Sequence, residues 1–105
     1  MWFIFPQIAG LGHSEMARAF ALASRAEVLA YLEHPILGSR LRECTTLVNR
    51  IEGHTATQIF GSPDDLKFRS SMTLFAAVMP NTAIFEEALR KYFKGISDPL
   101  TLERL

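Results

Sequence analysis

The sequence predicts an all-α fold, formed by a single small domain of four to five helices over residues 1–105. Apolar residues recur at spacings of three and four along most of the chain. Helix-capping residues separate these stretches, and no strand-like alternation occurs outside the first five residues. A chain of 105 residues is long enough to bury one hydrophobic core.

The chain begins with an uninterrupted apolar run, Met1–Phe5, which contains three aromatic rings. Burying one such ring is worth about 1.5–3 kcal/mol, so the run belongs in a core or against a partner. With no upstream helix in this chain to cover it, we expect self-association through an interface or a swap of these five residues.

Two helix starts are predicted in residues 14–33. Ser14 can cap a helix that begins at Glu15, and Ser24 with Glu27 has the form of a capping box. The pattern is compatible with one bent helix, with two helices, or with a short extended stretch around Ala21–Ala23. It ends before Pro35, because the residue before a proline is pushed away from helical angles.

The clearest helical stripe follows, with Pro35 in its first turn and Gly53 at its C-terminal end. Cys44 lies on this stripe, which indicates an inert core thiol. The apolar residues of the stripe are Leu37, Leu41, Cys44, Val48 and Ile51.

A second capping box, Thr55 with Gln58, predicts a short turn over 56–60. The next helix is expected to be capped by Ser62, with Pro63 in its first turn, and to end at Val78 or Met79.

The last long helix is predicted over 84–94, with Gly95 as its stop. Its spacing favours two ion pairs, Glu86 with Arg90 and Glu87 with Lys91. Asp98-Pro99 can start one further turn through Arg104.

Charge and composition argue against several classes of protein. Eleven basic and eleven acidic residues cancel, so we expect no nucleic-acid partner and no membrane partner. One cysteine and three scattered histidines make no metal-binding spacing, and no cofactor is predicted. The apolar start is a poor signal peptide, and we expect a cytoplasmic protein.

The helix predicted over 62–78 carries the most interesting polar residues. Lys67 and Ser71 are neighbours on a widened apolar side, where they could line a pocket or form a base and nucleophile. Snorkelling by the lysine and back-bonding by the serine are the commoner explanation. The core stripe is predicted as Phe68, Met72, Phe75 and Met79, with Arg69, Ser70 and Thr73 on the opposite, polar side.

Three further residues complete the candidates. Arg69 is spaced for an exposed ion pair with Asp65 but could instead reach an anion. Gln7 is the one polar side chain in the apolar start, and His13 follows a glycine-containing turn that could offer backbone N–H groups to an anion. The ligand-binding candidates are therefore Gln7, His13, Lys67, Arg69 and Ser71, and no catalytic residue is assigned.

The chain resembles the bacterial family called domain of unknown function 1810, some of whose members have been mislabelled calpastatin. The resemblance implies a small, mainly helical bacterial domain, compatible with solenoid-like stacking of helix pairs, and no established activity. The family extends upstream by a helix, so this chain is expected to be a trimmed or shortened version. The matching blocks are Trp2–Gln7, Gly10–Gly12, Tyr31–Leu32, His34–Pro35, Leu37–Gly38, Arg40–Leu41, Phe60–Gly61, Asp65–Lys67 and Ser70–Phe75.

Two functions follow as hypotheses, and the sequence leaves open whether the protein is an enzyme. The first is binding or processing of a small anionic metabolite in a polar pocket formed by the five candidates. The alternative is a non-enzymatic module for protein–protein interaction. A well-formed pocket would favour the first, and a flat, dry surface the second.

Overall fold

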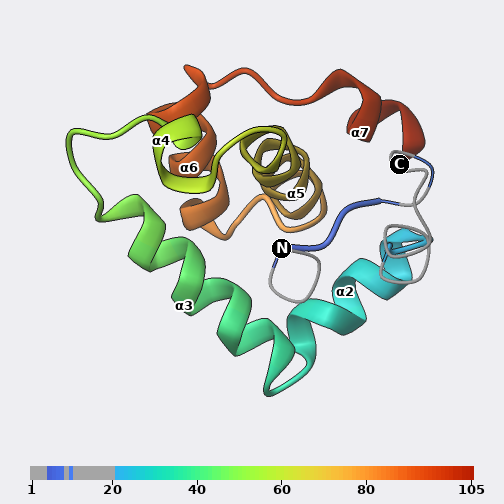
Figure 1. Cartoon of the computed structure of the whole chain (residues 1–105). Coiled ribbons are helices and arrows are strands. Elements are labelled where there is room, and N and C mark those ends of the chain that lie inside the picture. Colours follow the sequence, from blue (N-terminus) through green and yellow to red (C-terminus); the bar gives the residue numbers. More distant parts are fainter. Residues whose placement is uncertain (1–4, 9, 11–20) are drawn as a thin grey trace.

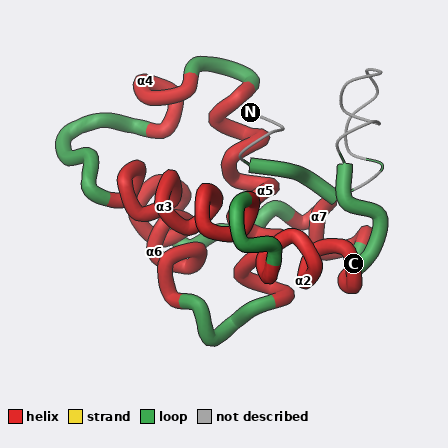
Figure 2. The backbone as a smooth tube through the Cα atoms, turned by 90° about the horizontal axis from the view of Figure 1, so that it is seen from below, coloured by secondary structure: helices red, strands yellow, loops and turns green. Residues whose placement is uncertain are grey.

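The computed structural model describes residues 5–8, 10 and 21–105 (Figure 1). Within these residues the fold is all-α, as predicted, and its β-structure is a single isolated bridge between Ile8 and Leu22. Figure 2 shows helices joined by loops throughout this part of the chain. The six helices are α2 (Arg25–Glu33), α3 (Leu37–Asn49), α4 (Ala56–Phe60), α5 (Asp64–Val78), α6 (Ala83–Phe93) and α7 (Pro99–Arg104).

Helix α5 occupies the centre of the molecule, where it contacts α2, α4, α6 and α7 (Figure 1). The consecutive helices α2 and α3 form one pair, and α5 and α6 form another. The first pair packs on the second through the α2–α5 and α3–α6 contacts. The radius of gyration is 12.6 Å, and a compact domain of this length is expected to have about 13 Å.

The core lies along the predicted stripe of α5. Phe68, Met72 and Phe75 are fully buried, which confirms the helical periodicity. The Phe68 ring stacks on Phe60 of α4 with a centroid distance of 4.6 Å. The Phe75 ring lies 5.5 Å from that of Phe85, so aromatic contacts join α5 to both α4 and α6.

The segment Phe5–Ile8 is buried beside α5. The Phe5 ring meets those of Phe68 and Phe60 edge-on, at 5.0 and 6.0 Å, so the last residue of the apolar run is covered by its own chain. Residues 1–4 lie outside the described part of the structure, and self-association through the run stays a prediction.

Two predicted caps are confirmed. The Ser24 hydroxyl accepts a hydrogen bond from Glu27 N–H at 3.3 Å, and the Glu27 carboxylate bonds to the N–H of Ala23. Thr55 and Gln58 form a complete capping box at the start of α4. The helix expected from Ser14 falls outside the described residues, as does the question of whether it joins α2.

The expected start of α5 is wrong by one residue. Pro63 occupies the N-cap position, and Ser62 makes no capping bond. Instead, the Asp65 carboxylate accepts hydrogen bonds from its neighbour Leu66 N–H at 2.8 Å and from the Thr57 hydroxyl at 2.6 Å. The predicted Asp65–Arg69 ion pair does not form.

The limits of α3 also differ from the prediction. The helix begins at Leu37, because the His34 ring Nδ1 accepts from the Ile36 and Leu37 N–H groups at 3.2 and 3.1 Å. It ends at Asn49, well before Gly53.

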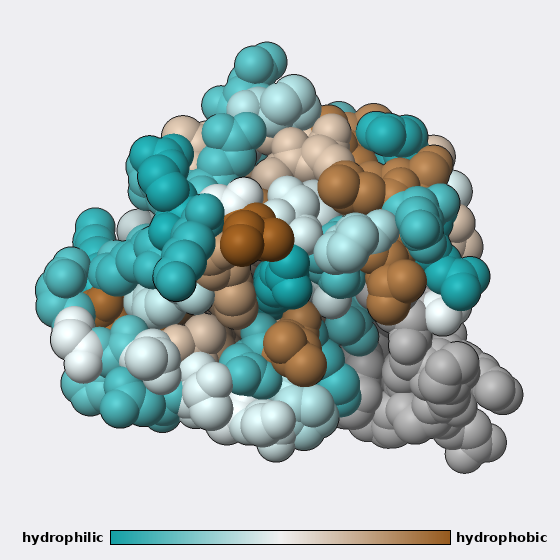
Figure 3. All heavy atoms as spheres, turned by 90° about the horizontal axis from the view of Figure 1, so that it is seen from above, coloured by the Kyte–Doolittle hydropathy of each residue, from teal (hydrophilic) through white to brown (hydrophobic). Residues whose placement is uncertain are grey.

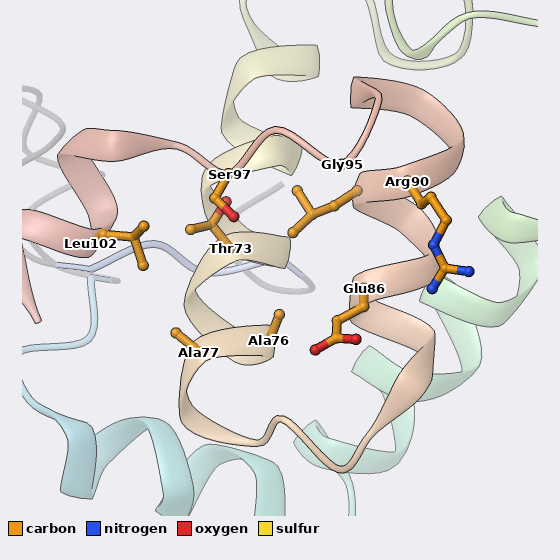
Figure 4. Close-up of a pocket in the computed structure, with 9 residues that line it drawn as sticks. Thr73, Ala76, Ala77, Glu86, Arg90, Gly95, Ser97 and Leu102 are labelled. Atoms are coloured by element: carbon orange, nitrogen blue, oxygen red, sulfur yellow. The ribbon is translucent and has the colours of Figure 1, made fainter.

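The two ion pairs expected on α6 are absent from the described residues. Lys91 reaches Glu52 at 3.2 Å, and so links α6 to the segment after α3. Glu86 and Arg90 do not pair, because their side chains point in different directions (Figure 4). Among the described helices, none has the length and apolar character needed to cross a membrane.

Candidate functional site

The candidate site lies where α5 meets the C-terminal segment. Arg69 holds this segment through two backbone carbonyls: its Nε donates to Ile96 O at 3.0 Å and its Nη2 donates to Ser97 O at 2.7 Å. The guanidinium therefore has a positioning role in the fold.

Asp98 is the centre of a hydrogen-bond network between α5 and α7. Its Oδ2 accepts from the Ser70 hydroxyl at 2.9 Å and from the Thr101 hydroxyl at 2.6 Å. Its backbone N–H donates to Thr73 Oγ1 at 2.9 Å. These bonds bury residues on the side of α5 that was predicted to be polar: Ser70 is 8% exposed and Thr73 is 1% exposed.

A cavity of about 380 Å³ lies next to this network, at the N-terminal end of α5. Gln7 enters it from the N-terminal segment and is only 8% exposed. Its carboxamide has no hydrogen-bond partner among the described residues. The described residues that line the cavity are Gln7, Pro63, Leu66, Lys67, Arg69, Ser70, Asp98 and Leu100.

The structure brings three of the five candidates together, namely Gln7, Lys67 and Arg69. Ser71 does not line the cavity; it is fully buried, and its hydroxyl has no partner among the described residues. His13 lies outside the described part of the chain. A Lys67–Ser71 pair of base and nucleophile is therefore not present.

The sequence prediction missed Ser70 and Asp98 as lining residues. The sequence analysis predicted that Asp98 starts a helix, and Asp98 does occupy the N-cap position of α7. Its contact with Ser70 spans 28 positions, and no local pattern reveals such a contact.

The charges on the cavity wall are two cations and one carboxylate. Lys67 is partly buried and lies 4.0 Å from Asp64, one turn earlier on α5. Asp98 carries the negative charge, and the two hydroxyl groups on its Oδ2 stabilise that charge. The lining thus carries a net positive charge, at the helix end where the dipole is also positive.

Other reactive groups lie apart from this cavity. Cys44 is partly buried against the core, as predicted for a structural thiol. Burial raises the pKa of the Tyr31 hydroxyl, an effect that the nearby Arg40 charge opposes and Cys44 reinforces. The described residues contain no group of three or more His, Cys, Asp or Glu side chains placed to hold a metal ion.

Comparison with known proteins places the chain in a family. The family model described as "Protein of unknown function (DUF1810)" matches residues 1–105. The chain belongs to this family. The fold is similar to the crystal structure of the conserved hypothetical protein Rv1873 from Mycobacterium tuberculosis, with a TM-score of 0.97 and 48% sequence identity. That match covers 99% of this chain and 74% of the mycobacterial chain, while no curated protein matches.

These findings confirm the resemblance seen in the sequence, and with it the small helical domain. The DUF1810 description names no activity. The function must therefore be argued from the site itself.

Proposed function

We propose that this DUF1810 domain binds a small anionic metabolite in the cavity between α5, α7 and the N-terminal segment. The Gln7 side chain carries the proposal, because this residue is only 8% exposed, lines the cavity and makes no side-chain hydrogen bond to another described residue. A polar ligand in the cavity would form hydrogen bonds with the Gln7 carboxamide.

The charge of the lining favours an anion. Lys67 offers an ammonium group, and the Arg69 guanidinium keeps Nη1 in addition to the two nitrogens bonded to Ile96 and Ser97. The first turn of α5 adds the positive end of a 15-residue helix. The volume of about 380 Å³ is at the lower end of ligand pockets, which suits a small metabolite.

The proposal covers binding alone. The serine that could act as a nucleophile, Ser71, is buried away from the cavity. The hydroxyl that does line the cavity, Ser70, is already bonded to Leu66 O and to Asp98.

A thermal-shift panel tests the proposal, starting from inorganic phosphate and extending to phosphorylated and carboxylated metabolites. A compound that raises the melting temperature is then titrated against Lys67→Gln and Gln7→Leu. We expect each variant to bind about tenfold more weakly, which corresponds to the loss of about 1.4 kcal/mol from one charge-assisted hydrogen bond.

The matched control is Lys94→Gln, which removes the same charge from an exposed position outside the cavity lining. Its affinity should stay within about twofold of the unchanged protein. Equal losses of affinity in Lys67→Gln and Lys94→Gln would mean that anion binding depends only on the net charge of the protein. No response to any member of the panel would contradict the proposal.

The alternative, a protein-interaction module, is favoured by exposed apolar side chains beside the cavity. Leu66, Ile96 and Leu100 are 57%, 58% and 57% exposed. On the face of the molecule shown in Figure 3, however, hydrophobic residues form patches among hydrophilic ones. A continuous apolar surface of the kind that marks stable interfaces is not visible there.

A further inference from the structure

A second hollow, of about 400 Å³, lies between α5 and α6 and is bounded by the segment that leads to α7 (Figure 4). The segment that contains Ser97 and Asp98 separates this hollow from the proposed anion-binding cavity, because Ser97 lines the hollow and Asp98 lines the cavity. Its described lining residues are Thr73, Ala76, Ala77, Glu86, Leu89, Arg90, Gly95, Ser97 and Leu102.

Small residues create the space in this hollow. Ala76 and Ala77 form its α5 wall, and Gly95 borders it at the end of α6. A Cβ built on Gly95 would meet no atom within 4 Å, so this side is open. The apolar surface comes from Leu89, which is 5% exposed, and from Leu102.

Glu86 and Arg90 are the two charged residues that line the hollow. Its spacing to Arg90 favours an ion pair on the helix surface, yet no such pair forms among the described residues. Figure 4 shows the Glu86 carboxylate extending from α6 toward Ala76, across the hollow, while the Arg90 guanidinium turns to the other side of α6. Arg90 also borders a neighbouring shallow hollow, with Asn49, Glu52, Glu87 and Lys91.

We propose that this hollow binds a small organic amine, with the ammonium group at Glu86 and the alkyl body against Leu89 and Leu102. A carboxylate beside the apolar side chains of Leu89 and Leu102 suits a cation that carries carbon. It does not suit a metal ion, because calcium and magnesium need several oxygen ligands. The amine site is independent of the proposed anion-binding cavity. The two share no lining residue, and the amine would pair with a carboxylate, whereas the anion would pair with cationic side chains.

The probe is n-butylamine, which is protonated at pH 7, and its neutral counterpart is 1-butanol. Methyl NMR spectra of the full 105-residue chain report on Ala76, Ala77 and Leu102 directly. We expect saturable shifts of these methyl groups with the amine, at concentrations on the order of 1 mM for so small a ligand. The alcohol should bind at least about fivefold more weakly, because it lacks the charge that pairs with Glu86.

Two matched variants decide the role of Glu86. Glu86→Gln keeps the size of the side chain and should weaken amine binding about tenfold. Glu87→Gln removes the same charge from the next residue of α6, which faces the neighbouring hollow, and should leave binding within about twofold.

A third variant tests the position of the ligand. Ala77→Leu fills the hollow and should abolish the shifts of the Ala76 methyl group, while well-dispersed spectra show that the chain is folded. The proposal is overturned by non-saturable shifts, by equal affinity for amine and alcohol, or by equal losses in Glu86→Gln and Glu87→Gln.

Discussion

Two helix junctions in this molecule are built in opposite ways. At the α2–α3 junction the backbones touch: a Cβ on Gly38 would lie 2.0 Å from the carbonyl oxygen of Leu32. The connecting residue His34 ends α2 with its backbone N–H and caps α3 with its ring.

At the α5–α7 junction, polar side chains hold the elements together. Arg69, Ser70 and Thr73 bond to the segment that contains Asp98, and Thr101 of α7 bonds to the same carboxylate. Elements joined through side chains lie farther apart than elements whose backbones touch. A cavity lies on each side of this network. In this fold, the two cavities thus lie where hydrogen-bonded side chains separate the elements.

The largest expected effect is at the closely packed junction. Gly38→Ala should destabilise the protein by about 3 kcal/mol, because the methyl group must displace backbone that cannot move easily. The neighbouring exposed Ser39→Ala should change the free energy of unfolding by less than about 0.5 kcal/mol. Urea denaturation of both variants measures the difference. A neutral Gly38→Ala would show that α2 and α3 are not in backbone contact.

A smaller effect is expected at the hydrogen-bonded junction. Asp98→Ala removes the acceptor of the buried Thr101 hydroxyl and one of two acceptors of Ser70, at a cost of about 1–3 kcal/mol. Asp98→Asn keeps an oxygen acceptor and should cost less. If urea denaturation gave equal stability for Asp98→Ala and the unchanged protein, the network would not hold α7 in place.

The smallest effect concerns pH, on the α2 side of the molecule. Burial raises the pKa of Tyr31 above its ordinary value of 10.0, so the folded state keeps the proton to higher pH than the unfolded state. The resulting contribution to stability is complete below about pH 10 and falls as pH rises through the folded-state pKa. Tyr31→Phe should reduce the loss of stability between pH 9 and 11, measured by denaturation at each pH. An identical pH profile in both proteins would contradict the raised pKa.

The sequence predicted the parts of the fold that depend on local spacing. The stripe of Phe68, Met72 and Phe75 was found from periodicity, and the caps at Ser24 and Thr55 from short motifs. Local patterns carry this information because neighbouring turns of one helix determine it.

The candidate site was predicted less well, because it depends on contacts between distant residues. Gln7, Lys67 and Arg69 line one cavity, although their role in binding stays a prediction, and nothing local showed that Ser70 meets Asp98. Ser71 was selected for its spacing from Lys67, although it lies buried outside the cavity. Helical spacing shows which residues are neighbours, and tertiary packing decides which of them border a cavity.

We propose that ligands enter the hydrogen-bonded junction and not the closely packed one. Amide and methyl chemical shifts, recorded with a mixed set of small anions and small amines, test it most directly. We expect saturable shifts to cluster in residues 63–77 and 86–102, with none in the α2–α3 contact around Leu32 and Gly38. Saturable shifts centred on that contact, or an absence of saturable shifts throughout the chain, would contradict the account.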